Sequence, residues 1–148
     1  MEEKIKLIKR LYSAKVEDIN DIQFMLCTNI FDKIRYSKVF IKGFNKSRRT
    51  FIIALLNCYG FEKEDLYLIY NQNKIIGCLT LREIDRRTMT LYDFTILSKY
   101  RGQNFSKKAL HKVYNICLEE GKKRLTLDVK KNNIIGYNLY MQEGFREY

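Results

Sequence analysis

Apolar positions in the first third of the chain switch between a period of two and a period near 3.6. Residues 5–12 are rich in β-branched and aromatic side chains, which is typical of a strand. A helix is expected to open at Val16. Its apolar face would consist of Ile19, Ile22, Met25 and Leu26. Residues 31–46 fit neither period well, so their structure stays open.

The middle of the chain predicts one helix followed by three consecutive strands. Ser47 can cap a helix that Gly60 would end. Strands are expected at 66–70, 74–81 and 89–97, with short polar turns at 71–73 and 85–87. Because short turns join neighbouring strands, the three are predicted to form an antiparallel meander.

The last third predicts a long helix, a strand and a shorter helix. The long helix starts at Asn104 or Ser106 and runs through Glu120, and a buried strand follows at 124–129. The shorter helix is capped by Asn133 and ends at Glu143. The predicted order is β-α-α-β-β-β-α-β-α-β, an α/β (α+β) fold with helices on the faces of a sheet.

Length and hydropathy bound the class of protein. A chain of 148 residues fits a single domain, which we expect to span 1–148. The longest apolar run covers only 51–56, far short of a membrane span. The first four residues are acidic before they are basic and lack the apolar centre of a signal peptide. We therefore expect a cytoplasmic protein with no membrane partner.

The formal charge of +11 raises the question of a polyanionic partner. The basic residues are spread throughout the chain, which is also rich in Ile, Asn and Tyr and lacks Pro and Trp. Such a composition accounts for the charge without any partner. Nucleic acid binding is therefore an alternative that the sequence alone does not favour.

The cysteines and the single histidine do not form a metal-binding pattern. Each cysteine stands alone in an apolar stretch, and no C-x-x-C pair occurs. The four are Cys27, Cys58, Cys78 and Cys117. We expect buried free thiols and no metal. His111 falls on a predicted helix face without an evident partner, so a cysteine nucleophile paired with it is not expected.

The segment 93–106 runs from a strand through a glycine turn directly into a helix N-terminus. Unpaired backbone N–H groups and the positive end of the helix dipole meet at such a junction. This arrangement predicts an anion site. The segment is neither a Walker loop nor a G-x-G-x-x-G fingerprint, because it has only Gly102. The alternative is an ordinary strand-to-helix turn, in which Gly102 only provides the backbone conformation.

The sequence YRGQNFS at 100–106 resembles the acyl-CoA signature Q/R-x-x-G-x-G/A of the GNAT superfamily of N-acetyltransferases. Arg101 occupies the first position, whereas Asn104 and Ser106 stand where the family usually has glycine or alanine. The resemblance implies that this loop holds the phosphates of acetyl-CoA. The implied residues are Arg101, Gly102, Gln103, Asn104, Phe105 and Ser106.

A second match, NIIGYNLYMQEGF at 133–145, is similar to the late helix and turn of the same family, with Gly136 in place of the usual alanine. Together the motifs imply a GNAT-like, mixed and mostly antiparallel sheet flanked by helices. Members continue past the Gly-Phe turn into further strands, but here only 146–148 follow. The C-terminal strand is thus expected to be short or missing, leaving a sheet edge that is open or covered by a second subunit in a homodimer.

The resemblance also implies a direct reaction between acetyl-CoA and an amine. Backbone N–H groups of Ile96 and Leu97 would bind the pantetheine arm and the thioester oxygen. Tyr140 would protonate the leaving thiolate, unless it is only a core tyrosine. Asp93 and Glu83 are candidate bases, each with a surface or structural role as the alternative. Asn133 would bind the pantetheine arm or only cap its helix.

The acceptor and the acyl-chain preference remain open at this point. An acetyltransferase acting on a primary amine is the leading interpretation. One alternative is a degenerate, non-catalytic GNAT fold that binds acyl-CoA or nucleic acid. Another keeps the enzyme and makes its acceptor an aminoacyl-tRNA or a ribosomal component, because of the net charge.

Overall fold

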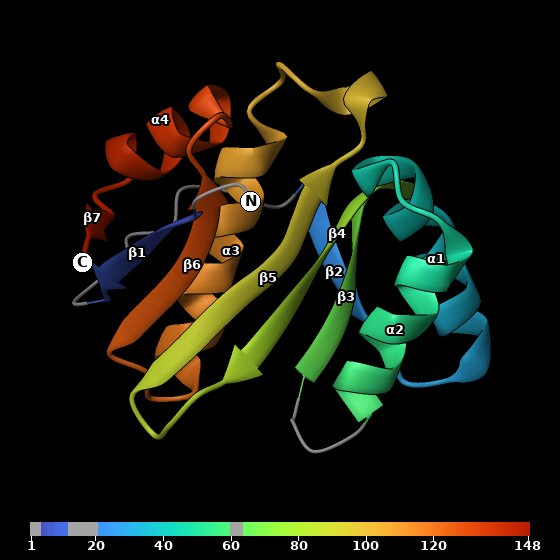
Figure 1. Cartoon of the computed structure of the whole chain (residues 1–148), viewed down its shortest axis with the longest axis horizontal. Helices are drawn as coiled ribbons and strands as arrows, with labels where there is room; N and C mark the ends of the chain where they lie inside the picture. Colours follow the sequence, from blue (N-terminus) through green and yellow to red (C-terminus); the bar gives the residue numbers. More distant parts are fainter. Residues whose placement is uncertain (1–3, 12–20, 60–63) are drawn as a thin grey trace.

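The chain folds into a seven-stranded sheet with helices on both faces (Figure 1). The structure, a computed structural model, describes residues 4–11, 21–59 and 64–148, except for the side chains at 54 and 57–59. The strands are β1 Lys4–Arg10, β2 Ile22–Leu26, β3 Glu64–Asn71, β4 Lys74–Glu83, β5 Thr88–Ile96, β6 Arg124–Lys130 and β7 Arg146–Glu147. The helices are α1 Ile30–Phe44, α2 Arg48–Tyr59, α3 Phe105–Glu119 and α4 Ile134–Gln142, with a short 3-10 turn at Ser98–Tyr100. In the described part, no helix is long and apolar enough to span a membrane.

The strands follow the order β2-β3-β4-β5-β6-β1-β7 across the sheet. The expected mixed and mostly antiparallel sheet is confirmed, because β5 and β6 pair in parallel and every other neighbouring pair is antiparallel. The predicted meander is β3, β4 and β5. Gln72 and Asn73 both adopt positive φ between β3 and β4, as a tight two-residue hairpin turn requires.

The predicted helix over the first third is wrong where it can be compared. Ile22–Leu26 forms the edge strand β2, which pairs antiparallel with β3. Over so short a run, the helical spacing of a few apolar residues cannot be distinguished from the alternation of a strand. The segment becomes a strand because it pairs with β3. The proposed helix start at Val16 lies outside the described residues.

Residues 31–46, left open by the sequence, form most of helix α1. Asn29 caps this helix by accepting a hydrogen bond from the N–H of Asp32 at 3.0 Å, and Asn45 ends it with a left-handed φ of 50°. Ser47 caps α2 as predicted, accepting from the N–H of Thr50 at 3.3 Å. The predicted end at Gly60 lies outside the described residues.

The sheet continues beyond β6 through β1 and β7. β1 pairs antiparallel with β6 over its whole length, from Lys4 opposite Lys130 to Arg10 opposite Arg124. β7, only two residues long, pairs with the far side of β1. The short C-terminal strand is therefore confirmed, and the covering of the sheet edge by a second subunit stays a prediction.

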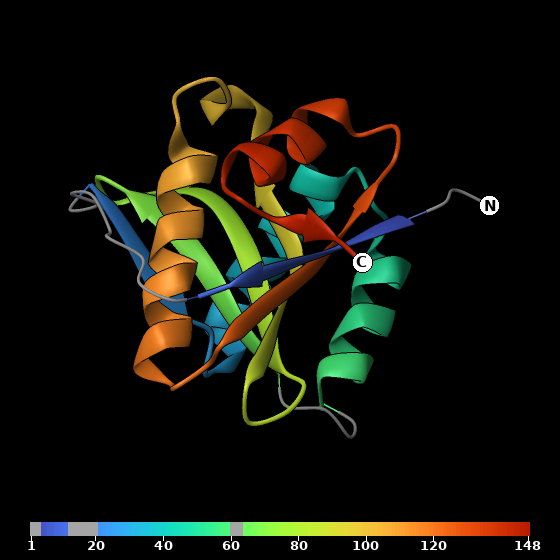
Figure 2. The same cartoon turned by 90° about the vertical axis from the view of Figure 1, so that its left-hand side faces the viewer.

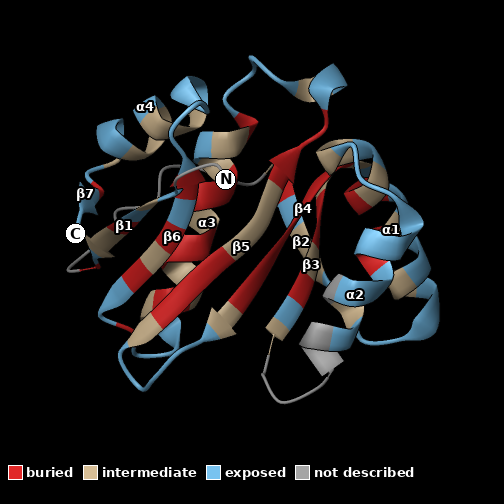
Figure 3. Ribbon diagram, viewed as in Figure 1, coloured by how far each residue is buried: buried red, intermediate tan, exposed pale blue. Residues whose placement is uncertain are grey.

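Two separate cores lie on the two faces of the sheet (Figures 2 and 3). The larger core joins β1, β4, β5 and β6 to α3, with Leu110 and Leu125 fully buried. The smaller one packs α1 and α2 on the other face, around Tyr36, Phe40 and Phe51. Among the described residues, α1 packs on this face against β3, β4 and β5. Helices α3 and α1 thus contact β5, the strand that leads into the candidate site, from its two faces.

Candidate active site

The site begins where the two parallel strands of the sheet separate. β5 and β6 pair only from Thr88 opposite Arg124 to Leu91 opposite Leu127, although both strands continue beyond these residues. A cavity of about 370 Å³ lies at this fork. Asp93, Asn133 and Tyr140 all contribute to its wall. The structure therefore brings together three of the sequence-predicted site residues.

A bulge in β5 turns Asp93 into this cavity. Thr80 of β4 lies opposite Tyr92, whereas Cys78 lies opposite Thr95, so that two residues of β5 face one of β4. Asp93 itself has a φ of 50°, which a β-bulge permits and which Asp tolerates better than most residues. Gly77 makes room for the bulge, because a Cβ there would lie 2.2 Å from the carbonyl oxygen of Thr95.

Asp93 is a carboxyl group with an altered acidity. Burial raises the pKa of Asp93 to about 6, with the charge of Glu64 adding to the shift and Lys4 opposing it. At neutral pH most of this group is ionised, yet it retains appreciable basicity. Such a carboxylate, inside a cavity, can accept a proton from an ammonium group.

The end of β5 directs one backbone N–H toward the fork. The N–H of Leu97 donates to the carbonyl oxygen of Ile76 at 2.8 Å. This bond makes Gly77 and Ile96 a non-hydrogen-bonded pair, so the N–H and C=O of Ile96 point away from β4, to the side that β6 has left. The N–H of Ile96 therefore faces the fork, whereas the N–H of Leu97, the second donor that the resemblance implies, is used in the hydrogen bond to Ile76.

The predicted anion loop joins β5 to α3 at the same end of the sheet (Figure 1). Asn104 is the N-cap of α3, but its side chain makes no capping hydrogen bond. The first turn of α3 carries no acidic residue and includes the exposed Lys107. Its N–H groups and dipole are therefore available to an anion. Phe105 anchors the turn, since its side chain is buried in the core.

Two residues of this loop need a left-handed backbone. Gly102 has a φ of 79° and Asn104 a φ of 64°. Asn is the residue that best replaces Gly in this region, which explains how Asn104 can stand where the family usually has a small residue. A Cβ at Gly102 would meet nothing within 4 Å, so its surroundings are open. Gln103 is exposed and Ser106 partly exposed.

Arg101 folds back toward the strand that precedes it. Its Nε donates to the carbonyl oxygen of Ile96 at 2.8 Å. The guanidinium is thereby fixed at the end of β5, beside the start of the anion loop. Through the carbonyl oxygen of Ile96, Arg101 therefore connects the end of β5 to the loop that follows.

Tyr140 reaches the fork from the opposite arm, on helix α4. Its ring packs edge-on against Phe145, with ring centroids 5.6 Å apart. Burial raises the pKa of Tyr140 to about 12, so that the phenol stays protonated at neutral pH. Asn133 caps the same helix by accepting from the N–H of Gly136 at 3.0 Å, and it also lines the cavity. The two roles proposed for Asn133 are thus compatible in space.

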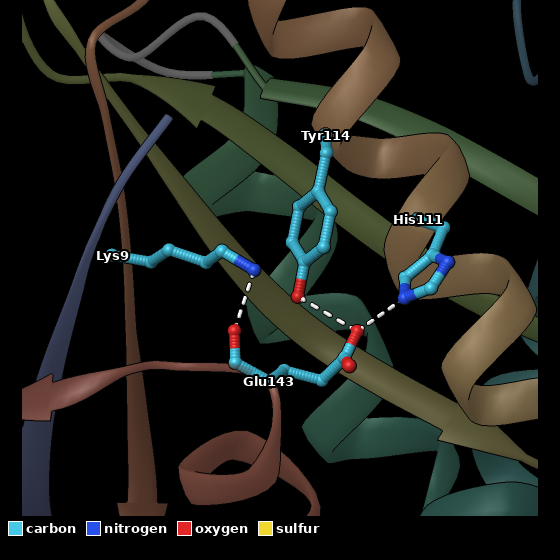
Figure 4. A network of polar contacts seen from close by, with 4 residues as sticks. All are labelled: Lys9, His111, Tyr114 and Glu143. Carbon is cyan, nitrogen blue, oxygen red and sulfur yellow. Dashed lines mark hydrogen bonds and ion pairs between the residues drawn. The ribbon is translucent and has the colours of Figure 1, made fainter. Parts of the chain in front are cut away.

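A polar network fastens the end of α4 to α3 and β1 (Figure 4). The carboxylate of Glu143 contacts His111 Nε2 and accepts from the hydroxyl of Tyr114 at 3.3 Å. Lys9 donates to the main-chain carbonyl of Glu143 at 2.6 Å. The expectation that His111 lacks a partner is therefore wrong. Because Glu143 closes the helix that carries Tyr140, the network holds that helix in place.

Glu83 is the one candidate residue that lies away from the fork. It ends β4 opposite Met89, at the far end of β5 from Ile96. Its carboxylate pairs at 3.0 Å with Lys122, whose side chain is buried and also donates to the carbonyl oxygen of Asp85. A proton-transfer role for Glu83 loses its geometric support. The strand was correctly predicted, but the wrong end of it was taken as the site.

The cysteine side chains among the described residues are buried free thiols. Cys27, Cys78 and Cys117 are buried and free, and burial raises the pKa of each thiol, to about 11 for Cys27. Such neutral thiols are poor nucleophiles. The side chain of Cys58 lies outside the described set. Within the described chain, no group of three or more His, Cys, Asp or Glu side chains could hold a metal.

Nine further residues line the cavity that the sequence did not single out as site residues. Among them are Lys4, Phe44, Asp128 and Lys130. Lys4 comes from β1 and Phe44 from the end of α1, so only the tertiary fold brings them to the fork. Alternation in β6 would have placed Asp128 and Lys130 on one face, but not beside Asp93.

Known proteins resemble this chain in sequence and in fold. The family model of the acetyltransferase (GNAT) family matches residues 31–145. An uncharacterized N-acetyltransferase, YycN from Bacillus subtilis strain 168, is 31% identical over 80 residues, which cover 52% of this chain and 51% of that protein. The aligned segment therefore spans about half the length of this relative.

Solved structures with low sequence identity share the fold. A GCN5-related N-acetyltransferase from Sphaerobacter thermophilus has a TM-score of 0.78 at 15% identity, over 98% of this chain and 48% of that one. A GNAT family acetyltransferase from Elizabethkingia anophelis, with acetyl-CoA bound, has a TM-score of 0.65 at 21% identity, over 86% and 77%. With the family match over most of the sequence, these findings show that the chain belongs to the GNAT acetyltransferase family.

Proposed function

We propose that this protein transfers the acetyl group of acetyl-CoA to a primary amine by direct attack, without a covalent enzyme intermediate. One observation carries the proposal: an ionised carboxylate and a protonated phenol, Asp93 and Tyr140, line the same cavity at the fork of β5 and β6. A proton acceptor and a proton donor are the two groups that this reaction needs.

The residues at the fork fit acetyl-CoA. The uncapped first turn of α3, with Gly102 and Asn104 in left-handed conformations before it, suits a pyrophosphate. The N–H of Ile96 suits a carbonyl oxygen of the pantetheine arm or of the thioester. Acetyl-CoA would supply an acyl group already activated as a thioester. The protein then has only to bind, orient and move protons.

Each residue has a distinct task in this scheme. Asp93 takes a proton from the incoming ammonium so that the free amine can attack. The N–H of Ile96 is a fixed donor that can stabilise negative charge on an oxygen beside the end of β5. Tyr140 keeps its proton at neutral pH, so its hydroxyl can donate a hydrogen bond to the departing sulfur and stabilise the charge that develops there. Arg101 keeps the end of β5 and the anion loop in one arrangement.

The test is acetyl-CoA-dependent turnover with a panel of amines, measured as free thiol released. The panel should contain a polyamine, an aminoglycoside and peptides with free N-termini. Once an acceptor is found, Asp93→Asn is expected to lower kcat/KM by about 100-fold. Glu83→Gln is the matched control, because it removes a carboxylate at the other end of the same sheet and should leave kcat/KM within about twofold.

The outcomes separate catalysis from binding alone. Equal activity of the wild type and Asp93→Asn would remove Asp93 from the mechanism. Binding of acetyl-CoA without turnover on any amine would favour a non-catalytic acyl-CoA-binding protein. Failure to bind acetyl-CoA would contradict the proposal itself.

A further inference from the structure

Half of one face of the sheet has no helix packed on it within the described chain. α1 packs against β3, β4 and β5 on this side, while α3 and α4 contact β6 from the opposite side (Figures 1 and 2). The strands β6, β1 and β7 extend beyond α1 and α2. Their side chains on this side are therefore accessible to a partner.

Strand register identifies the residues on this open face. Lys9 Nζ lies 3.9 Å from the ring centre of Tyr114 on α3, so the odd-numbered residues of β1 face α3 and the even-numbered ones face away. Residues directly opposite in a ladder share a face. The open face thus carries Lys4, Lys6, Ile8, Arg10, Arg124, Thr126, Asp128, Lys130 and Arg146.

This set is strongly basic, and we call it the basic face. Six of its nine residues are Lys or Arg, all of them exposed, and only one is acidic. The basic residues that look evenly spread in the sequence are gathered here by the pairing of three strands. Since side chains on one face of a strand repeat every second residue, cations recur about 7 Å apart along part of β1.

Two hollows mark the ends of the basic face. At one end, Lys4 and Lys130 belong to the cavity at the fork, whose wall also includes Asp93 and Asp128. At the other, Arg10, Arg124 and Arg146 outnumber the single acidic residue, Glu147, in the wall of a second cavity of about 600 Å³. Lys4 and Arg10 begin and end β1, so about 20 Å separates the two hollows. An extended polyanion can occupy both, whereas a small anion can occupy only one.

We propose that the basic face binds the phosphate backbone of a single-stranded nucleic acid. The planar fork of arginine matches phosphate oxygens in pairs, and three arginines line one hollow. Ile8 lies among these cations and offers an apolar surface against which a base can pack. A folded acidic protein would need carboxylates at matching fixed positions, whereas a flexible strand can adjust its phosphates to the cations. This proposal does not depend on acetyl transfer.

The experiment measures fluorescence anisotropy of a labelled single-stranded RNA of mixed sequence, about 20 nucleotides long, as the protein is titrated in. Arg10→Glu with Arg124→Glu is expected to weaken binding at least about tenfold, and the slope of log K against log salt should fall by about 0.7 per lost contact. The matched control, Lys38→Glu with Arg49→Glu, makes the same charge change at exposed positions of α1 and α2. It should weaken binding no more than about twofold.

Two further measurements keep the result interpretable. The far-ultraviolet circular dichroism spectrum and the Tm should be the same in the wild type and in both double variants, which shows that each is folded. If the double variant does not fold, Lys6→Glu alone tests the same face. Absence of RNA binding by the wild type at low salt would overturn the proposal. Equal losses in both double variants would also overturn it, as would competition by polyglutamate as effective as that by unlabelled RNA.

Discussion

The two arms of the fork contribute to the candidate site by different means. The arm of β5 and α3 offers one side chain, Asp93, and otherwise backbone groups: the N–H of Ile96 and the first turn of α3. The arm of β6 and α4 offers side chains, Tyr140 above all. A backbone donor tolerates changes of residue type that keep its conformation, whereas a side-chain donor is lost with a single atom. Substitutions should therefore act very differently on the two arms.

The largest expected effect falls on the side-chain arm. Tyr140→Phe removes one oxygen and should lower kcat about 100-fold while leaving acetyl-CoA affinity unchanged. Tyr137→Phe on the same helix is the control, because its hydroxyl donates to the exposed Glu147 at 2.6 Å and lies outside the cavity wall. Steady-state kinetics with the acceptor found above decides. Equal kcat values in the two variants would leave Tyr140 as a packing residue.

Gly77 tests whether the bulge on the backbone arm needs space. Gly77→Ala is expected to lower the free energy of unfolding by about 2 kcal/mol, because the new Cβ would meet the backbone of Thr95, which cannot move aside cheaply. Gly102→Ala, with open space around it, should cost only the strain of its positive φ, about 1 kcal/mol. Urea unfolding of both variants gives the comparison. A smaller loss in Gly77→Ala than in Gly102→Ala would contradict the bulge.

The ionised carboxylate of Asp93 is expected to lower the free energy of unfolding at neutral pH. Its pKa is raised to about 6, so the folded state binds this proton more tightly than the unfolded chain. The free energy of unfolding therefore falls as pH rises from about 4 to 6, and stays lower above that range. Asp93→Asn should then raise Tm at pH 7.5, by roughly 2–4 °C for each 1 kcal/mol gained, with little change at pH 4.

The same carboxylate sets the expected pH profile. In the wild type, kcat/KM should rise with pH up to about 6 and then level off as Asp93 becomes ionised. Thermal unfolding and kinetics over pH 4–8 check both expectations together. A Tm difference that is the same at every pH would show that Asp93 has an ordinary pKa.

The smallest effect is expected at Asn104, on the backbone arm. Asn104→Gly keeps the left-handed conformation, so acetyl-CoA affinity should stay within about twofold. Asn104→Ala must adopt the same positive φ at a cost of about 1 kcal/mol, measurable by urea unfolding. A large loss of affinity in Asn104→Gly would mean that the Asn side chain itself binds the cofactor.

Local signals made part of this structure predictable. The meander followed from strand alternation and polar turns, and the start of α3 followed from the glycine turn into a helix at Asn104. Asn133 was recognisable as a cap from its position before a helix. Resemblance to a family directed attention to Tyr140, which a chain with eleven tyrosines would not otherwise have singled out.

Long-range pairing accounts for what the sequence did not show. No local pattern places β1 between β6 and β7, and that placement both covers the edge of β6 and brings Lys4 to the cavity. The contact of His111 with Glu143 joins residues 32 positions apart. Glu83 was misjudged because a strand pattern does not say which end lies at the fork.

The most direct test of the central claim is calorimetric titration with acetyl-CoA. Wild-type protein should bind, and Ser106→Glu should lower affinity at least about tenfold, because a carboxylate in the first turn of α3 would repel the phosphates held there. Thr28→Glu, at an exposed position ahead of α1, adds the same charge and should bind like the wild type. Undiminished binding by Ser106→Glu, or none by the wild type, would contradict the account.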